Sequence, residues 1–213
     1  ALFDVFNGMA DALTGETGDF AITPNTGDTQ NSYSFSNGVL TVNNGANLTI
    51  SMADGSTNPT GNRIVIAENA TASIKLNGVN IAGAGASEAS STTYSAITLS
   101  TGSSLTLTLA QNSTNTLKGG DGGAAGGAGA PAVRVPANTT LTVLCANQSE
   151  NDHICGNACG SLSAPGGSST SSLGGVGIGG ATTGGSSGPA GGSSYNSESC
   201  GTVLLLGGNI KVD

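Results

Sequence analysis

Residues 97–109 read ITLSTGSSLTLTL, and this stretch decides the fold. Apolar residues occupy every second position on both sides of a polar turn, which is the period of a β-strand with one buried face. The same pattern recurs in residues 39–50, 64–76 and 133–143. In each copy eight positions separate an apolar residue of the first run from one of the second: Val42 and Ile50, Ile66 and Ile74, Leu99 and Leu107, Val135 and Val143. A constant pattern at variable spacing predicts stacked repeats with loops of differing length.

These short strands favour an all-β fold, a right-handed parallel β-helix (β-solenoid). A strand of three to five residues buries little by itself, but identical runs stacked at about 4.8 Å build a continuous core. A β-sandwich would have longer strands and more aromatic residues than the 3% found here. We expect the solenoid to span residues 37–213 and its strand pattern to resume after the Gly-rich stretch, at 176–180 and 202–212. The Gly/Ser-rich segments would project as loops.

The N-terminal segment, residues 1–36, differs from the repeats. Its first residues place apolar side chains at helical spacing: Leu2, Val5, Phe6, Met9 and Leu13. One interpretation is a cap over the first coil of the solenoid, which would otherwise be open. The other is a subunit-joining segment that docks on a neighbouring molecule. The sequence leaves both open.

Four cysteines lie in the last third of the chain: Cys145, Cys155, Cys159 and Cys200. Two disulfides that tie down the Gly/Ser-rich loops are the favoured interpretation, with three connectivities open. A zinc site would need two close pairs, whereas only Cys155 and Cys159 are close and His153 is the only histidine. Free thiols are the third alternative. Disulfides, together with an N-terminus that resembles a processed mature end, predict a secreted or cell-surface protein.

Five Asn-x-Ser/Thr sequons are glycosylation candidates and favour the same location: Asn47, Asn69, Asn112, Asn138 and Asn147. Such sequons also arise by chance in a chain rich in Asn, Ser and Thr, so their use remains open.

Composition excludes several function classes. Only five Lys and Arg residues stand against 13 Asp and Glu, which gives a net charge of −8 and makes a nucleic-acid partner improbable. No run of 18 apolar residues is present, so we expect no membrane span.

Some of these stretches resemble a known family. Residues 74–81 (IKLNGVNI), 133–143 (VRVPANTTLTV) and 175–180 (GVGIGG) are similar to the coils of extracellular pectin-lyase-like right-handed parallel β-helix proteins. The resemblance covers residues 37–213 and implies the architecture. That family includes polysaccharide-binding proteins, adhesins, lyases and hydrolases, so the resemblance does not select an activity.

Catalysis is not expected, because the repeats carry no paired carboxylates. Asp121 lies between glycine pairs and suggests calcium, but the Gly-Gly-x-Gly-x-Asp calcium repeat is absent, so we expect no cofactor. The pairs Thr106/Thr108 and Thr140/Thr142 suggest an ice-binding row, yet no other copy matches them. Two hypotheses remain: a structural or adhesive solenoid that self-associates into head-to-tail filaments, and a polysaccharide-binding surface module.

Overall fold

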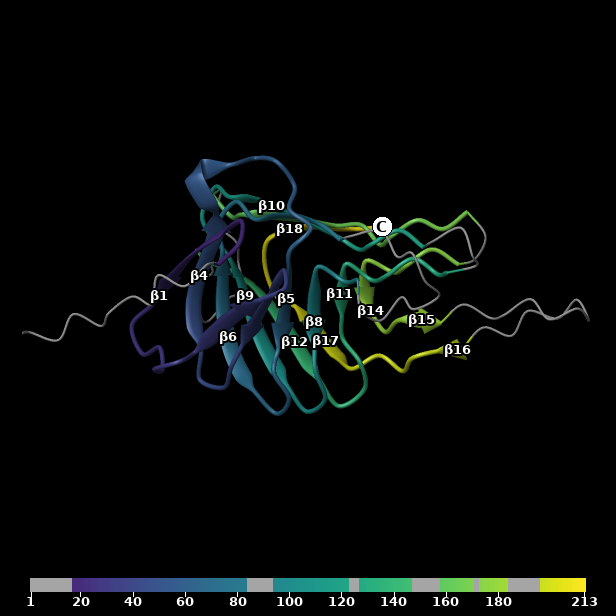
Figure 1. The fold of residues 1–213 in the computed structure, drawn as a ribbon, viewed down its shortest axis with the longest axis horizontal. Coiled ribbons are helices and arrows are strands. Elements are labelled where there is room, and N and C mark those ends of the chain that lie inside the picture. Colours follow the sequence, from purple (N-terminus) through teal and green to yellow (C-terminus); the bar gives the residue numbers. More distant parts are fainter. Residues whose placement is uncertain (1–16, 84–93, 123–126, 147–157, 171–172, 184–195) are drawn as a thin grey trace, which may run out of the picture.

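The computed structural model describes residues 17–83, 94–122, 127–146, 158–170, 173–183 and 196–213. Within these ranges the chain is all-β, with one short 3-10 helix, η1 (Ala53–Gly55), and no α-helix. Three sheets contain nearly all the strands, and most neighbouring strands are parallel (Figure 1). The expectation of an all-β chain with parallel strand pairing is therefore confirmed.

Each sheet takes its strands from segments far apart in the sequence. Sheet A has the order β1 (Phe20–Pro24), β4 (Asn47–Met52), β6 (Thr71–Leu76), β9 (Ser104–Leu109), β12 (Thr140–Cys145) and β17 (Thr202–Leu205). Sheet B has the order β14 (Ile178–Gly179), β11 (Val133–Arg134), β8 (Ile97–Leu99), β5 (Arg63–Ile66), β3 (Val39–Val42) and β2 (Tyr33–Ser36). Sheet C has the order β18 (Asn209–Val212), β13 (Ser161–Ala164), β10 (Thr114–Lys118) and β7 (Asn80–Ala82). Strands β15 (Thr182–Thr183) and β16 (Asn196–Ser197) form a separate antiparallel pair.

The chain passes through the sheets in a fixed order, B then A then C, and we call one such passage a circuit. Three complete circuits are β5–β6–β7, β8–β9–β10 and β11–β12–β13, and a fourth is β14–β17–β18. Strands β3 and β4 begin an earlier circuit, in which Thr60 bridges to Ile81 and so reaches sheet C. Strands β14, β17 and β18 thus continue the strand pattern beyond the Gly-rich stretch, as the sequence predicts.

The interior is a stack of aliphatic side chains contributed by successive circuits. Along β6, β9 and β12 every second residue is buried, which matches the alternation in the sequence. The register places Ile74 beside Leu107, and Leu107 beside Val143, as the eight-position spacing predicts. These three side chains are at most 1% exposed.

The first repeat departs from the predicted alignment. Ile74 pairs with Leu48, and Ile50 pairs with Leu76, so the second run of this repeat is offset by two residues. The turn before β4 is correspondingly shorter, and Asn44 Oδ1 accepts a hydrogen bond from the Thr71 N–H at 2.9 Å beside it. A shift of two residues keeps every side chain on its face of the sheet. The burial pattern is therefore preserved.

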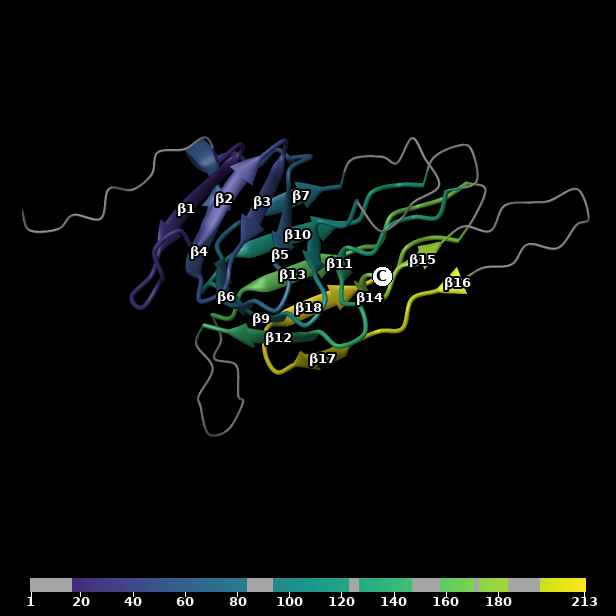
Figure 2. The same cartoon turned by 60° about the horizontal axis from the view of Figure 1, so that its bottom comes forward.

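Two antiparallel strands cover the first circuit. Strand β1 pairs with β4 and strand β2 pairs with β3, so both lie at sheet edges (Figure 2). Phe20 of β1 is 1% exposed, and Tyr33 and Phe35 of β2 pack against the core from outside. This arrangement fits a cap formed by residues 20–36. The apolar residues of the predicted helical spacing, Leu2 to Leu13, lie outside the described residues.

The described Gly-rich segments extend away from the sheets beside one another and are joined by backbone hydrogen bonds (Figure 1). The Gly122 N–H donates to Ser168 O at 2.7 Å, the Gly167 N–H to Ala130 O at 2.8 Å, and the Gly175 N–H to Gly167 O at 2.7 Å. Residues 127–130 are buried in this bundle. A Cβ atom on Gly129 would lie 1.9 Å from the Gly167 carbonyl oxygen, so side chains there would prevent the backbones from approaching. Backbone hydrogen bonds between these segments therefore add to the disulfide ties that the sequence predicts.

Candidate functional site

The outward face of sheet A is an array of hydroxyl groups. Strands β4, β6, β9 and β12 each present three outward positions, and nine of these twelve residues are Ser or Thr. The other three are Asn47, Lys75 and Leu144. The register aligns them in rows that cross the strands: Thr71–Ser104–Thr140, Asn47–Ser73–Thr106–Thr142 and Thr49–Lys75–Thr108–Leu144. The register places Thr108 between Lys75 and Leu144, so the pairs Thr106/Thr108 and Thr140/Thr142 form no continuous threonine rows, in agreement with the sequence-based expectation.

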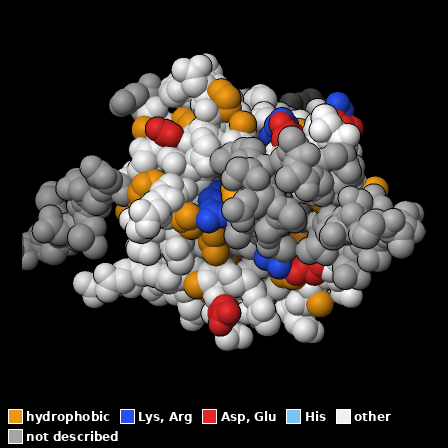
Figure 3. Space-filling view, turned by 45° about the vertical axis from the view of Figure 1, so that its right-hand side comes forward, with side chains coloured by type: hydrophobic (Ala, Val, Ile, Leu, Met, Phe, Trp, Pro, Cys, Tyr) orange, Lys and Arg blue, Asp and Glu red, His pale blue; other side chains and the backbone are white. Residues whose placement is uncertain are grey.

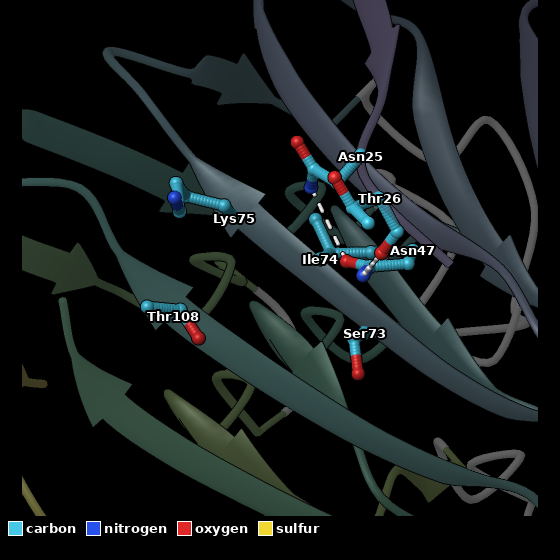
Figure 4. A pocket seen from close by; sticks show the side chains of 7 residues that line it. All are labelled: Asn25, Thr26, Asn47, Ser73, Ile74, Lys75 and Thr108. Carbon is cyan, nitrogen blue, oxygen red and sulfur yellow. Dashed lines mark hydrogen bonds between the residues drawn. The ribbon is translucent and has the colours of Figure 1, made fainter. Parts of the chain in front are cut away.

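A hollow of about 370 Å³ opens on this face, where the loop after β1 lies over the sheet. Its lining is polar apart from one isoleucine and consists of Asn25, Thr26, Asn47, Ser73, Ile74, Lys75 and Thr108. Figure 4 shows the amides of Asn25 and Asn47 together on one side, with Lys75 and Thr108 across from them. The amide oxygens and N–H groups, the hydroxyls and the ammonium could all form hydrogen bonds with a ligand in this hollow.

A hydrogen-bond network holds the two amides in place. Asn25 Nδ2 donates to Asn47 Oδ1 at 3.2 Å, and Asn25 Oδ1 accepts from Thr49 Oγ1 at 2.9 Å. Asn47 Nδ2 donates to the Thr26 carbonyl oxygen at 2.9 Å, and the Asn47 backbone N–H donates to Asp28 Oδ1 at 2.7 Å. The wall of the hollow is therefore ordered by contacts between β1, its following loop and β4.

The cysteines behave differently from the prediction of two disulfides. Cys145, at the end of β12, forms a disulfide with Cys159, which precedes β13. This bond closes a loop between residues of sequence separation 14. Cys200 is exposed and carries a free thiol, so its predicted pairing is wrong in this structure. Its position beside Pro136, with which it forms an isolated bridge, sets it apart from the Cys145–Cys159 bond. Cys155 and His153 lie outside the described residues.

The sequons occupy two kinds of position. Asn69, Asn112 and Asn138 are exposed and adopt left-handed φ angles of 55°, 56° and 62° in turns between strands. Asparagine tolerates this conformation better than most residues, so turn geometry also explains these three asparagines. Asn47 is half-buried in the hollow, and a glycan on its Nδ2 would disturb the bond to Thr26. Asn147 lies outside the described residues.

Charged groups are few, and several are paired (Figure 3). Arg134 makes a two-point contact with Glu198, at 2.9 Å from Nε and 2.5 Å from Nη2. Asp121 binds Lys118 Nζ at 3.0 Å and the Ser168 N–H at 2.7 Å. The Ser168 N–H, aided by Lys118 and opposed by burial, holds the pKa of Asp121 below its usual value. Both carboxylate oxygens of Asp121 therefore have protein partners. No described cluster of three His, Cys, Asp or Glu residues could hold a metal.

Sequence reasoning missed a buried polar residue that connects three circuits. Asn115 in β10 is 0% exposed, and its Oδ1 accepts from the Gly78 and Val79 N–H groups at 3.0 Å. Its Nδ2 donates to Ser113 Oγ at 2.9 Å and to the Ser161 carbonyl oxygen at 3.1 Å. Its place at an inward position of a T-N-T-L-K strand is the signal that could have identified it.

No protein-family model, curated protein or solved structure matches this chain. The resemblance to pectin-lyase-like proteins therefore stays a prediction. In the described part of the chain, no helix has the length and apolar character needed to cross a membrane.

Proposed function

We propose that the protein is a non-enzymatic extracellular structural protein, a right-handed parallel β-helix whose copies assemble head to tail. The fixed order of sheets in successive circuits supports the solenoid. The right hand follows from the strong preference for right-handed crossovers between parallel strands.

The observation that carries the proposal is the exposed final circuit. Strands β14, β17 and β18 are the edge strands of sheets B, A and C, so all three sheets end at the same circuit (Figure 2). Leu205 of β17 is 47% exposed and Val212 of β18 is 41% exposed. Their partners in the preceding circuit, Val143 and Ala164, are fully buried. The last circuit thus presents core-type side chains and strand edges that no other described strand pairs with, which favours association with another chain.

The opposite end offers strand edges of its own. Strand β1 ends sheet A and strand β2 ends sheet B, and both run antiparallel to their neighbours. A second copy placed against the final circuit could extend sheets A and B by pairing β17 with β1 and β14 with β2. Such a contact joins two different surfaces, and repeated contacts of this kind build an open filament.

The extracellular location is supported by two features. The Cys145–Cys159 disulfide persists in oxidising compartments, and Asn69, Asn112 and Asn138 are exposed on turns where a glycan would meet solvent. The N-terminal segment, residues 1–36, keeps both proposed roles, as a cap or as a subunit-joining segment. Deleting residues 1–16 would leave β1 in place, so this variant tests the first part of the segment without removing a sheet edge.

Sedimentation velocity over a range of protein concentrations tests the assembly. We expect the wild type to form oligomers that grow with concentration and Leu205→Lys to remain monomeric. Leu173→Lys is the matched control, because Leu173 is 44% exposed but lies in the Gly-rich bundle and not on a strand. A monomeric wild type, or equal assembly by Leu205→Lys, would contradict the proposal.

The second candidate function is polysaccharide binding, and the hydroxyl rows of sheet A favour it. The two functions are compatible because they use different surfaces. The hydroxyl rows lie on the outward face of sheet A, whereas the proposed contact between copies lies at the two ends of the stack of circuits.

A further inference from the structure

We propose that residues 1–16 of one copy dock on strand β18 of the preceding copy, at the exposed final circuit. This inference rests on the head-to-tail assembly proposed above and deepens it, because it names the segment that covers the third sheet of the joint. It also assigns this part of the chain to the joint between copies and not to a cap.

The first circuit has no open core for residues 1–16 to cap. Phe20 of β1 and Leu48 of β4 are at most 1% exposed. Strand β7 is the edge strand of sheet C, yet its Ile81 is 0% exposed, and Thr60 forms a bridge beside it. The described strands and the bridge therefore already close this end of the stack.

The final circuit keeps one sheet uncovered even in the proposed contact. Strands β17 and β18 lie at the opposite end of the stack from β1 and β2 (Figure 2). The contact pairs β17 with β1 and β14 with β2, but among the described strands none is available to pair with β18. Val212 of β18 is 41% exposed, whereas its partner Ala164 is fully buried. Ile210 is half-buried, whereas its partner Leu162 is 1% exposed. These apolar side chains favour a further segment of the next copy as their cover.

The described chain begins on the sheet C side of the first circuit. Asp19 Oδ2 accepts hydrogen bonds from Thr60 Oγ1 at 2.5 Å and from Asn62 Nδ2 at 3.2 Å. Thr60 in turn bridges to Ile81 of sheet C. Because the proposed contact continues sheets A and B from copy to copy, it also places β18 of the preceding copy on this side. Residues 1–16 therefore start beside the strand that lacks a partner.

The sequence of this segment, ALFDVFNGMADALTGE, suits β18. It contains six large apolar residues and three acidic residues, with no Lys or Arg. Strand β18 offers Ile210 and Val212 at inward positions and Lys211 between them. The apolar residues would cover the two aliphatic side chains, and the acidic residues would meet the lysine.

The geometry favours a neighbouring copy over the same chain. From Thr60 to its own β18 the segment would have to cross four strand spacings of sheet C, about 19 Å. In the head-to-tail contact, β18 of the preceding copy lies directly beside the point where the segment begins. Sixteen residues reach about 50 Å when extended, so length does not prevent either contact. The test therefore has to separate the two.

A labelled peptide of residues 1–16, added to the intact chain, tests the docking. Fluorescence anisotropy is measured at a protein concentration at which sedimentation velocity shows monomers. We expect saturable binding, and we expect an excess of unlabelled peptide to dissociate the oligomers formed at higher concentration. A peptide that carries Val5→Asp and Phe6→Asp is the control and should bind at least about tenfold more weakly, because it loses apolar contacts.

Two variants of the protein locate the docking on β18. Val212→Lys should weaken peptide binding about tenfold or more, because it places a charge among the apolar contacts. Leu204→Lys is the matched control, since Leu204 is 43% exposed in the same circuit but occupies an outward position of sheet A. It should change peptide binding by less than about twofold. Circular dichroism checks the strands, and the substituted peptide keeps the test valid if Val212→Lys does not fold.

The outcomes separate this inference from the filament itself. Oligomers that form while the peptide does not bind, or equal peptide binding by Val212→Lys and the wild type, would overturn the docking and leave the assembly standing. Binding that appears only after residues 1–16 are deleted would also overturn it, because the segment would then occupy β18 of its own chain. A monomeric wild type that binds the peptide would support the docking and contradict the filament.

Discussion

At the scale of a residue, Asn115 contributes most clearly to the stacking of circuits. Its side chain contacts the Gly78 and Val79 N–H groups in one circuit and the Ser161 carbonyl in another. A buried amide is tolerated because its hydrogen-bonding groups are satisfied, and removing it takes one hydrogen-bond partner from two N–H groups and one carbonyl.

We expect Asn115→Ala to lower the free energy of unfolding by roughly 2–5 kcal/mol. Urea denaturation followed by circular dichroism measures this change. Asn77→Ala is the control, because Asn77 is exposed, and it should cost at most about 0.5 kcal/mol. Equal stability of the two variants would show that the Asn115 bonds contribute little.

The Arg134–Glu198 pair predicts a pH dependence. Burial acts most strongly on Glu198 and raises its pKa, but the Arg134 hydrogen bonds, the Ala181 N–H and the Arg134 charge together outweigh burial, so the pKa is lowered. A carboxyl whose pKa is lower in the folded state stabilises the fold above its ordinary pKa. That stabilisation is lost as the pH falls through the folded-state value.

Thermal melts from about pH 6 down to about pH 3 check this pair. The melting temperature of the wild type should fall further over this range than that of Glu198→Gln, because glutamine has no carboxylate to protonate. Glu68→Gln, on an exposed turn, should follow the wild type. If Glu198→Gln declines as steeply as the wild type, the pair has no role in acid sensitivity.

For single residues, the sequence predicted which side chains of the strands are buried. It did not predict the state of Cys200 or the left-handed turns. The alternation around Ile74 and Leu107 fixes which side chains are inward, because the period of a strand is two. The sequence could not show that Cys200 carries a free thiol, because disulfide formation depends on distances between cysteines that the sequence does not contain. The left-handed turns at Asn69 and Asn138 could have been anticipated, because Asn and Gly share that turn position in the repeats.

At the scale of an element, the sequence predicts two strand runs per repeat, whereas the structure has three. The missed strands are β7, β10 and β13 of sheet C, whereas β18 lies within the predicted run 202–212. Strands β7 and β13 read NIA and SLSA. Such short runs of small and polar residues have little apolar alternation, so periodicity gives no signal for them. The register of β4 was also missed, because a shift of two residues preserves the pattern of buried positions.

The Gly-rich bundle gives a prediction for an element. Gly129→Ala should lower the free energy of unfolding by about 1–3 kcal/mol, because the new Cβ would lie 1.9 Å from the Gly167 carbonyl oxygen. Gly61→Ala is the matched control, since a Cβ there meets nothing within 4 Å, and it should be neutral or slightly stabilising. Chemical denaturation of both variants measures the difference. A neutral Gly129→Ala would show that the segments are not packed as described.

At the scale of the whole molecule, the two ends of the stack differ in structure. Antiparallel strands and the aromatic residues Phe20, Tyr33 and Phe35 cover one end, while parallel edge strands with Leu205 and Val212 lie at the other. Unlike ends allow one copy to follow another without closing into a pair, which is the requirement for a filament. The sequence could predict the repeats but not this asymmetry. The exposure of the last strands depends on where the final circuit lies on the stack, which the sequence does not show.

Electron microscopy of the native, undenatured protein tests the central claim most directly, with Leu205→Lys and the deletion of residues 1–16 imaged beside it. The account predicts unbranched fibres with an axial repeat of one subunit for the wild type and single particles for Leu205→Lys. Fibres that disappear in the deletion variant would assign residues 1–16 to the joint between subunits, and fibres that persist would leave the strand edges as the joint. Dispersed single wild-type particles at every concentration would contradict the account.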